Sequence, residues 1–577
     1  MSQLDWIILV VTLLAIIAYG LYKSRTSRNL DGYFLSNRSM PWGLILLSIM
    51  GTQASAITFV SAPGQAYTDG MRFVQYYFGI PLATIVICIF FVPIFSKLKV
   101  YTAYEYLESR FDGKTRTLTS FLFLLQRGLS TGISVFAPSI ILSSLLDWNI
   151  YWTNLFMGGL LIIYTMTGGA KAVAYTQQLQ LIIIFVGMFL AAYMVVNMLP
   201  ENIGFREALQ VSGKLGKLNV ITTGITDKGF NWSDQYNLLS GIIGGFFLAL
   251  SYFGADQSQV GRYLTARNIR ESRMGLLMNG FVKVPMQFVI LLVGVLVFVF
   301  YQFNKAPIFF NEVQVKKLEK SAYKDSFALV QNQFDTIAVQ KQEAISHYVA
   351  VMNTNETIAG EKSIAEVRSL QQQSDSLRKK VKKWIDSKQV GGDSNDTNYI
   401  FLRFVVDYLP AGLVGLLIAI IFLASWGSIA AAINSLASCT MVDFHRRFNH
   451  KQGSSGEDEY KLSQKYTLIW GIFCIVVAMF TYNIGNSLIE AVNVLGSLFY
   501  GVILGVFLVA FFCKQIRNSN AVFWGAVLAE LLVLAVFILT KTSPPVLKMG
   551  FLWLNPIGAL GVVFFSLLLN KILPEKK

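Results

Sequence analysis

Long apolar stretches alternate with short polar loops along most of the chain. Each stretch is about 20 residues long, the length at which a helix crosses the hydrocarbon core of a bilayer. The pattern predicts about thirteen such helices, at residues 3–22, 42–67, 73–97, 118–146, 150–167, 172–198, 237–261, 275–303, 408–440, 465–484, 487–513, 519–540 and 550–572. We therefore expect an all-α polytopic membrane protein, because a helix pairs its own backbone groups inside lipid.

One stretch, residues 305–398, departs from this pattern because it is polar and mixed in charge. Within it, apolar residues recur every three or four positions in FDTIAVQKQEAISHYVAVM (334–352) and IAEVRSLQQQSDSLRKKVKKWI (364–385). That spacing predicts two or three amphipathic helices. Three roles are open for this insertion: a tolerated addition between two spans, a lid, or a surface for an external partner.

Polar residues also interrupt two of the predicted spans. Segment 42–67 contains the small and polar run GTQAS at residues 51–55, and segment 237–261 turns polar after Gly254. Unpaired backbone groups are tolerated inside a membrane only where they line a cavity, and transporters bind solutes and ions at such breaks. Close packing of helices through small residues is the alternative interpretation.

The two interrupted spans begin two similar sets of five helices that cross the membrane in opposite senses, an arrangement typical of an inverted repeat. We divide the chain into a first helix and loop (1–41), the first repeat (42–198), an external loop (199–236), the second repeat (237–513, interrupted by 305–398) and two peripheral helices with the C-terminus (514–577).

Composition and charge support the membrane assignment. Hydrophobic residues make up 54% of the chain and charged residues 14%, whereas soluble domains carry about 25% charge. Much of the net charge of +15 lies in alternate loops, and loops rich in Lys and Arg mark the cytoplasmic side. These residues are Lys23, Arg25, Arg28, Arg38, Lys97, Lys99, Arg110, Lys114, Arg116, Arg262, Arg267, Arg270, Arg273, Arg446, Arg447, Lys451, Lys461, Lys465, Lys514 and Arg517. We expect the N-terminus and the insertion outside, the C-terminus inside, and no nucleic-acid partner.

Five sequence motifs are specific when they are taken together. They are YTAYEYLESRF (101–111), GGAKAVAYTQQLQ (168–180), DQSQVGRYLTAR (256–267), LPAGLVGLLIAIIFLASWGSIAAAINSLAS (409–438) and GVFLVAFFCK (505–514). With these motifs the chain resembles the sodium/solute symporter family, which includes sugar, proline, sialic acid, iodide and vitamin transporters. The resemblance implies a LeuT-type core of two five-helix inverted repeats, with one helix before it and two after it.

The resemblance also implies a sodium ion bound between the second and ninth predicted spans. The implied ligands are Gly51, Ala54, Ala424, Gly427 and Ser428. Residues three or four positions apart share a helix face, and neutral carbonyl and hydroxyl oxygens replace part of the hydration shell of an ion. A hydroxyl bonded back to its own helix is the alternative role for Ser428.

Two positions depart from the family pattern. Gly427 stands where many members have a second hydroxyl residue, and Gln177 stands where many have a carboxylate. Ala430 and Ala431 occupy the positions of hydroxyls that build another sodium site in some members. We therefore expect one sodium ion per transport cycle, with loss of sodium coupling or coupling to another cation as the alternatives.

The solute site is likewise implied by the resemblance to the sugar-transporting branch. The matching positions are Thr58, Tyr77, Ile80, Ala249, Tyr252, Lys283 and Asn493. Tyr77, Ile80 and Ala249 replace polar groups of that branch, and a sugar needs many paired hydroxyls. The site is therefore less suited to a hexose, and the solute stays open among sugars, carboxylates, anions and vitamin-like molecules.

Three charged residues lie within predicted spans, where charge is costly and marks functional sites. Lys283 is expected to meet the solute, or alternatively to hold backbone carbonyls at the nearby helix break. Arg127 and Asp256 are expected to pair as an inner gate, and Tyr252 to close the same path. A static pair that only packs two helices is the alternative.

Secondary active transport is the function that these features predict. Sodium binds first, a small organic solute binds next, and the protein imports both across the plasma membrane by alternating access. A membrane solute sensor with weak or no sodium coupling is the alternative function. The sequence contains no evident nucleophile with a neighbouring base, metal cluster or phosphate loop, so we do not expect an enzyme.

Overall fold

The computed structural model describes residues 1–23, 29–146, 148–352, 357–448, 456–481, 487–542 and 544–573. Within these ranges the chain is mainly helical, with one hairpin of strands β1 (Ile225–Thr226) and β2 (Gly229–Phe230). Three of the basic residues expected in cytoplasmic loops, Arg25, Arg28 and Lys451, lie outside the described residues.

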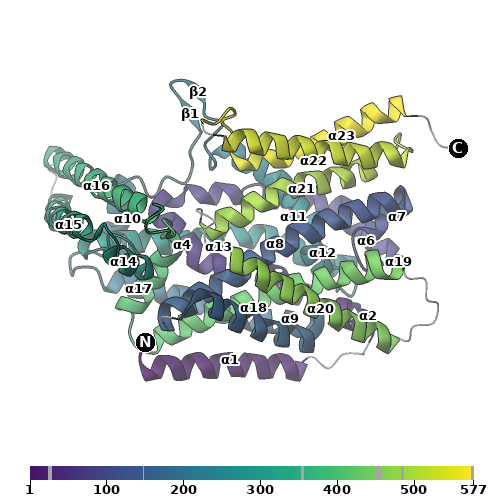
Figure 1. Cartoon of the computed structure of the whole chain (residues 1–577), viewed down its shortest axis with the longest axis horizontal. Coiled ribbons are helices and arrows are strands. Elements are labelled where there is room, and N and C mark those ends of the chain that lie inside the picture. Colours follow the sequence, from purple (N-terminus) through teal and green to yellow (C-terminus); the bar gives the residue numbers. More distant parts are fainter. Residues whose placement is uncertain are drawn as a thin grey trace.

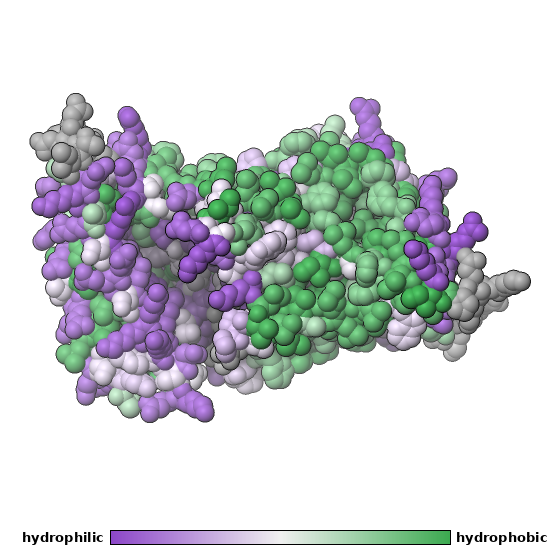
Figure 2. All heavy atoms as spheres, turned by 90° about the horizontal axis from the view of Figure 1, so that it is seen from above, coloured by the Kyte–Doolittle hydropathy of each residue, from purple (hydrophilic) through white to green (hydrophobic). Residues whose placement is uncertain are grey.

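Most helices run side by side between two ends of an elongated molecule (Figure 1). Hydrophobic side chains cover the middle of the face seen in Figure 2, and hydrophilic side chains gather at both ends. A membrane-spanning protein requires such a surface, because its lipid-facing part must be apolar. The helices of the insertion lie at one of these ends, which we call the insertion end (Figure 1).

The elements follow one another with short connections. Before the β-hairpin the chain forms α1 (Gln3–Lys23), α2 (Leu30–Leu35), η1 (Ser36–Arg38), α3 (Trp42–Gln53), α4 (Ala56–Asp69), η2 (Gly70–Tyr77), α5 (Ile80–Val86), η3 (Ile87–Phe91), α6 (Val92–Leu98), α7 (Glu105–Arg110), α8 (Gly113–Leu146), α9 (Ile150–Asn197) and α10 (Phe205–Lys214). After the hairpin come η4 (Ser240–Gly244), α11 (Gly245–Gly254), α12 (Gln257–Tyr263), α13 (Ile269–Phe303), α14 (Glu312–Glu319), α15 (Lys324–Met352), α16 (Thr357–Ile385), η5 (Thr397–Tyr399) and α17 (Ile400–Tyr408). The last elements are α18 (Leu413–Cys439), η6 (Thr440–His445), α19 (Arg446–Phe448), α20 (Gly456–Phe480), α21 (Leu488–Phe512), α22 (Ser519–Lys541), η8 (Phe551–Trp553) and α23 (Leu554–Ile572).

Ten helical segments of the described chain are long and apolar enough to cross a membrane. Three shorter apolar helices, Trp42–Gln53, Ile150–Met166 and Ser240–Gly254, fall on predicted spans as well. The all-α, multi-span architecture that the sequence predicted is therefore confirmed. The count of thirteen crossings and the orientation in the membrane stay predictions.

Helix α9 has 48 residues and unites the two predicted spans 150–167 and 172–198. A straight helix of that length would be about 72 Å long, far more than a bilayer is thick. The helix bends sharply instead. The evidence is the Tyr164 hydroxyl, which lies 2.5 Å from the Thr176 hydroxyl. On a straight helix these two residues would be about 18 Å apart. One bent helix thus accounts for two predicted spans.

The insertion forms three helices, as its amphipathic spacing predicted. Helices α15 and α16 pack as an antiparallel pair, since Lys341 donates to Gln371 (3.1 Å) and His347 bonds Ser363 (2.8 Å) further along both helices. A separate small core joins the base of this pair to α14 and the chain before it. That core contains Ile308, Phe309, Leu318, Phe327, Val330, Phe334, Val381 and Ile385.

Basic loops predicted on one side of the membrane meet at the end opposite the insertion. Arg38 donates to the Lys99 and Val100 carbonyls, both at 2.9 Å. Arg116 pairs with Asp443 at 2.6 Å. Figure 1 shows α2, α7 and α19 near this end, which we call the loop end. Alternate loops share a side because an even number of crossings separates them.

Two cysteine substitutions test the predicted orientation. Leu329 on α15 and Phe448 on α19 are both 67% exposed, at the insertion end and the loop end respectively. We expect a membrane-impermeant maleimide to label Leu329→Cys in intact cells and Phe448→Cys only after permeabilisation, because the loop end has the basic loops. The unsubstituted protein controls for its four native cysteines. Labelling of Phe448→Cys in intact cells would reverse the orientation.

Candidate functional site

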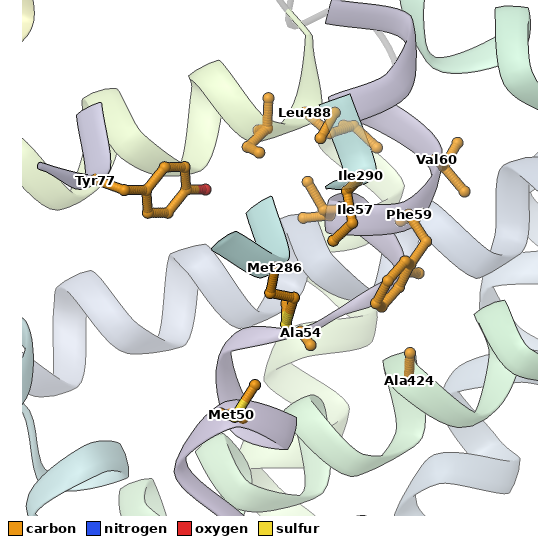
Figure 3. Packing of buried hydrophobic residues seen from close by; sticks show 14 of the residues in the cluster. Met50, Ala54, Ile57, Phe59, Val60, Tyr77, Met286, Ile290, Ala424 and Leu488 are labelled. Atoms are coloured by element: carbon orange, nitrogen blue, oxygen red, sulfur yellow. The ribbon is translucent and has the colours of Figure 1, made fainter. Parts of the chain in front are cut away.

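Helix α3 ends inside the membrane-spanning region and α4 continues after a short interruption. The Ser55 N–H donates to the Gln53 carbonyl at 3.0 Å instead of extending the helical pattern to Gly51. The last carbonyls of a helix have no partner within it, so the interruption leaves oxygens available at this level. Figure 3 shows Ala54 at this interruption and Ala424 on a neighbouring helix. The polar run GTQAS therefore marks a real helix break.

The second break separates α11 from α12, as the polar run after Gly254 predicted. The Asp256 side chain caps α12 by accepting a hydrogen bond from the Ser258 N–H at 2.7 Å. The Tyr104 hydroxyl donates to the Ala255 carbonyl at 2.8 Å. Backbone groups released by this break thus find side-chain partners inside the protein, which satisfies the requirement of a low-dielectric setting.

A cavity lies among α3, α4, η2, α5, α8, α11, α13, α18 and α21. Gln53 and Ser55 at the first break line it, and so does Phe253, just before the second break. All seven residues that the sequence nominated for the solute line it: Thr58, Tyr77, Ile80, Ala249, Tyr252, Lys283 and Asn493. These residues come from six different helical elements and are up to 435 positions apart in the chain. The structure brings them together around one space, while their contact with a solute stays a prediction.

Sequence reasoning missed one wall of the cavity, which is a polar face of α8. Gln126, Ser130 and Ser134 follow one another at intervals of four, and Arg127 and Thr131 lie beside them. Such spacing places them on one helix face. The signal was present in the sequence as QRGLSTGIS within an apolar span. Sequence reasoning also missed Gln53, Tyr76 and Tyr500, which line the cavity too.

Lys283 is a buried cation on the cavity wall, with 2% of its surface exposed. Its ammonium lies 5.5 Å from the centre of the Tyr77 ring, a cation–π distance. Among the described residues, no carboxylate lies within 4.0 Å of this ammonium. An intramembrane lysine normally has a partner, and the described residues supply no carboxylate for this one.

Arg127 and Asp256 form an ion pair between α8 and the start of α12. Tyr500 completes the group, because its hydroxyl accepts from Arg127 at 2.7 Å and donates to Asp256 at 2.6 Å. The Tyr252 ring packs on the Arg127 guanidinium at 5.4 Å. Gln259 donates to the Tyr252 hydroxyl at 2.7 Å. These contacts join three helices and α12 beside the cavity, and their role as an inner gate stays a prediction.

Gln177 on α9 lies between two of the residues nominated for sodium. A Cβ atom on Gly51 would come within 2.8 Å of its side chain, and one on Gly427 within 3.1 Å. The Gln177 amide donates to the Gly427 carbonyl at 3.0 Å and to the Thr52 hydroxyl at 3.2 Å. It accepts from Ser48 at 2.9 Å. One buried amide therefore ties α3 to α18, and the only oxygen of Gly427 is hydrogen-bonded.

Ser428 lines the cavity and donates its hydroxyl hydrogen to the Ser425 carbonyl at 3.0 Å. The back-bond that we considered as an alternative role is thus present. It does not exclude ion binding, because a hydroxyl oxygen keeps lone pairs when its hydrogen is donated. Sodium ligation by Gly51, Ala54, Ala424, Gly427 and Ser428 stays a prediction.

Two broken helices that meet at a cavity with a buried charge are typical of a secondary transporter. Comparison with known families agrees: the model of the sodium:solute symporter family matches residues 33–320 and 380–529. The chain belongs to this family, and it is a multi-pass protein of the plasma membrane. The tip of the insertion, residues 321–379, lies outside the match.

Several characterised relatives resemble the chain over most of its length. The sodium/sialic acid symporter NanT of Aliivibrio fischeri is 26% identical over 572 residues, which are 98% of this chain and 93% of the relative. The sodium/sialic acid symporter SiaT of Proteus mirabilis is 25% identical, over 92% of this chain and 89% of the relative. The sodium-dependent multivitamin transporter of Oryctolagus cuniculus is 24% identical, over 90% of this chain and 68% of the relative.

The fold is also that of a solved transporter structure. A substrate-bound outward-open state of a Na⁺-coupled sialic acid symporter matches with a TM-score of 0.73. The match covers 100% of this chain and 99% of the solved chain, at 22% sequence identity. The family resemblance that the five motifs suggested is therefore confirmed, together with its fold.

Gln177→Glu tests the amide between α3 and α18. A carboxylate cannot donate to Gly427 and Thr52, so we expect unfolding without sodium to become easier by about 2–4 kcal/mol. A cation bound among these oxygens offsets the loss, so sodium should raise the melting temperature more than in the parent protein. Thermal unfolding in sodium chloride and in choline chloride measures both. Gln178→Glu, half-buried on the same helix, is the matched control. Equal sodium shifts in all three proteins would contradict this prediction.

Proposed function

We propose that this protein is a sodium-coupled symporter that imports a small organic anion, with one sodium ion per transport cycle. The observation that supports the proposal most directly is the cavity that borders both helix breaks and contains all seven nominated solute residues. Membership of the sodium:solute symporter family supports sodium as the driving ion.

Sodium binds, in this proposal, where the interrupted end of α3 faces α18. Its ligands are oxygens of Gly51, Ala54, Ala424, Gly427 and Ser428. All of these ligands are neutral, and the Gly427 carbonyl already accepts a hydrogen bond from Gln177. A site without a carboxylate binds a cation less strongly than one with a formal negative charge. We therefore propose one sodium site of modest affinity.

The solute occupies the cavity with its negative group near Lys283. A carboxylate supplies the counter-charge that this buried ammonium lacks, and charge-assisted hydrogen bonds are about twice as strong as neutral ones. Asn493, which accepts a hydrogen bond from Tyr76 at 3.1 Å, and Thr58 offer further polar contacts. The names of two relatives support an acidic solute, since both are sialic acid symporters.

The ion pair of Arg127 and Asp256, with Tyr500 and Tyr252, forms the inner gate in this proposal. While these contacts hold, the cavity is separated from the loop end, which is predicted to face the cytoplasm. Release of solute and sodium requires that the pair separates as one repeat moves against the other. Sodium and solute are the ligands that shift this equilibrium, each by its different affinity for the two states.

Uptake into proteoliposomes with and without an inward sodium gradient tests the proposal, with labelled sialic acid and vitamin-like carboxylates as solutes and a neutral hexose as the comparison. We expect uptake by the parent protein to require the gradient. In Ser428→Ala we expect the sodium concentration for half-maximal uptake to be about tenfold higher, because a ligand that contributes about 1.4 kcal/mol is lost. Ser130→Ala, which removes a hydroxyl of α8 outside the proposed ligand set, is the control. Uptake that ignores sodium would refute symport, and unchanged sodium dependence in Ser428→Ala would refute the assigned ligand.

Lys283→Met tests the charge on the cavity wall. Methionine keeps most of the side-chain length and removes a buried charge, so the protein should fold. We expect the KM for an anionic solute to rise about 10- to 100-fold, since hydrogen bonds to charged groups contribute about 1.5–3 kcal/mol. Normal transport of the anion by a folded Lys283→Met protein would assign Lys283 a structural role instead.

A further inference from the structure

The segment through which the insertion returns to the core, Asp396–Asn398, touches two helices of the solute cavity. The Thr397 carbonyl packs on Gly64 of α4 so closely that a Cβ atom there would lie 2.0 Å from it. The Asn398 side chain accepts a hydrogen bond from the Leu488 N–H, at the start of α21, at 3.3 Å. We call Asp396–Asn398 the return segment.

The first turn of α21 depends on partners from outside the helix. The first N–H groups of any helix have no partner within it. Here the Leu488 N–H donates to Asn398, the Ile489 N–H to Ser61 of α4 at 3.4 Å, and the Glu490 N–H to Ser487 at 3.4 Å. Figure 3 shows Leu488 near the α4 residue Ile57. The return segment and α4 together therefore hold the start of α21 in place.

Both helices continue directly into the cavity wall. Ile57 and Thr58 line the cavity from α4, and Ile489, Val492 and Asn493 line it from α21. A change in the return segment is thus separated from the solute by one or two helical turns. The return segment joins the cavity helices to the helices of the insertion end.

Asp396 holds the return segment to the helices of the insertion. Its carboxylate is fully buried and lies 2.6 Å from Arg378 and 2.9 Å from Lys382, both on α16. It also accepts from the Phe310 N–H at 3.1 Å. Burial by itself raises the pKa of Asp396. The positive charges of Arg378 and Lys382 outweigh that effect, so the pKa lies below its ordinary value. The carboxylate is therefore charged at neutral pH, and removing it leaves two cations without their shared partner.

We propose that Asp396 is a positioning residue for transport: by fixing the return segment against α4 and α21, it sets how readily the cavity opens at the insertion end. The inference rests on the proposed function, because it assigns the insertion a part in solute access. It also explains why a hairpin outside the family match is tied by Arg378 to a residue next to the cavity helices.

Asp396→Asn in the full-length protein tests the proposal, because asparagine keeps the volume and removes the charge. Two readouts need no solute: amide hydrogen exchange at Leu488–Glu490, and labelling of Val492→Cys by a water-soluble maleimide, with the native cysteines alone as background. We expect both rates to rise about five- to tenfold, the change that the loss of one buried hydrogen bond produces. In uptake assays we expect the KM and the maximal rate to change by different factors, because access rather than binding is altered.

Three further variants make the result decisive. Asp335→Asn removes the ion pair of Asp335 with Lys305 (2.7 Å), which ties the same insertion to the chain after α13, and should leave both rates unchanged. Asp396→Glu should restore most of the parent behaviour. If Asp396→Asn does not fold, Asn398→Ala removes only the contact with Leu488 and should still raise exchange there.

The proposal would be overturned if the exchange and labelling rates of Asp396→Asn and Asn398→Ala equal those of the parent protein. It would also be overturned if Asp335→Asn raises these rates as much as Asp396→Asn does. Sodium-independent uptake by the parent protein would refute symport but would leave the exchange and labelling results intact. The two proposals therefore fail separately.

Discussion

Backbone hydrogen bonding in the low-dielectric interior of a membrane is the constraint on which this structure depends. An unpaired N–H or C=O group facing lipid costs several kcal/mol, so a helix may break only where protein or a cavity surrounds it. The chain breaks its helices after Gln53 and after Gly254, and the cavity borders both places. The site exists because the long uninterrupted helices of the rest of the fold surround these two helix breaks.

The same low dielectric explains why the two intramembrane cations differ. Arg127 has a carboxylate and a phenol as partners and joins helices beside the cavity. Lys283 has an aromatic ring but, among the described residues, no carboxylate within 4.0 Å. A paired charge holds elements together and has to be separated for movement, whereas an unpaired charge favours a ligand of opposite sign. The gate that we propose for Arg127 and the solute contact that we propose for Lys283 thus depend on the same physical penalty.

Polar contacts also connect parts of the chain that look independent in the sequence. Gln177 joins α3 to α18 through three hydrogen bonds, at the level where sodium is proposed to bind. At the insertion end, Asp396 joins a hairpin that the family model does not match to a segment that contacts α4 and α21. Both contacts are buried. The first joins two helices that line the cavity, and the second holds the return segment, whose residues Thr397 and Asn398 contact α4 and α21.

The sequence by itself determined the helical membrane class, the two breaks, the helices of the insertion and the grouping of basic loops. These features follow from local hydrophobicity, helix periodicity and charge, because the bilayer acts on each segment separately. Motif resemblance added the seven cavity residues. Only the tertiary structure decided that α9 bends between Tyr164 and Thr176, that Tyr500 joins Arg127 and Asp256, and that Gln177 separates Gly51 from Gly427. Such contacts join residues that are distant in the chain, or depend on how a helix bends and rotates, and no local pattern specifies that geometry.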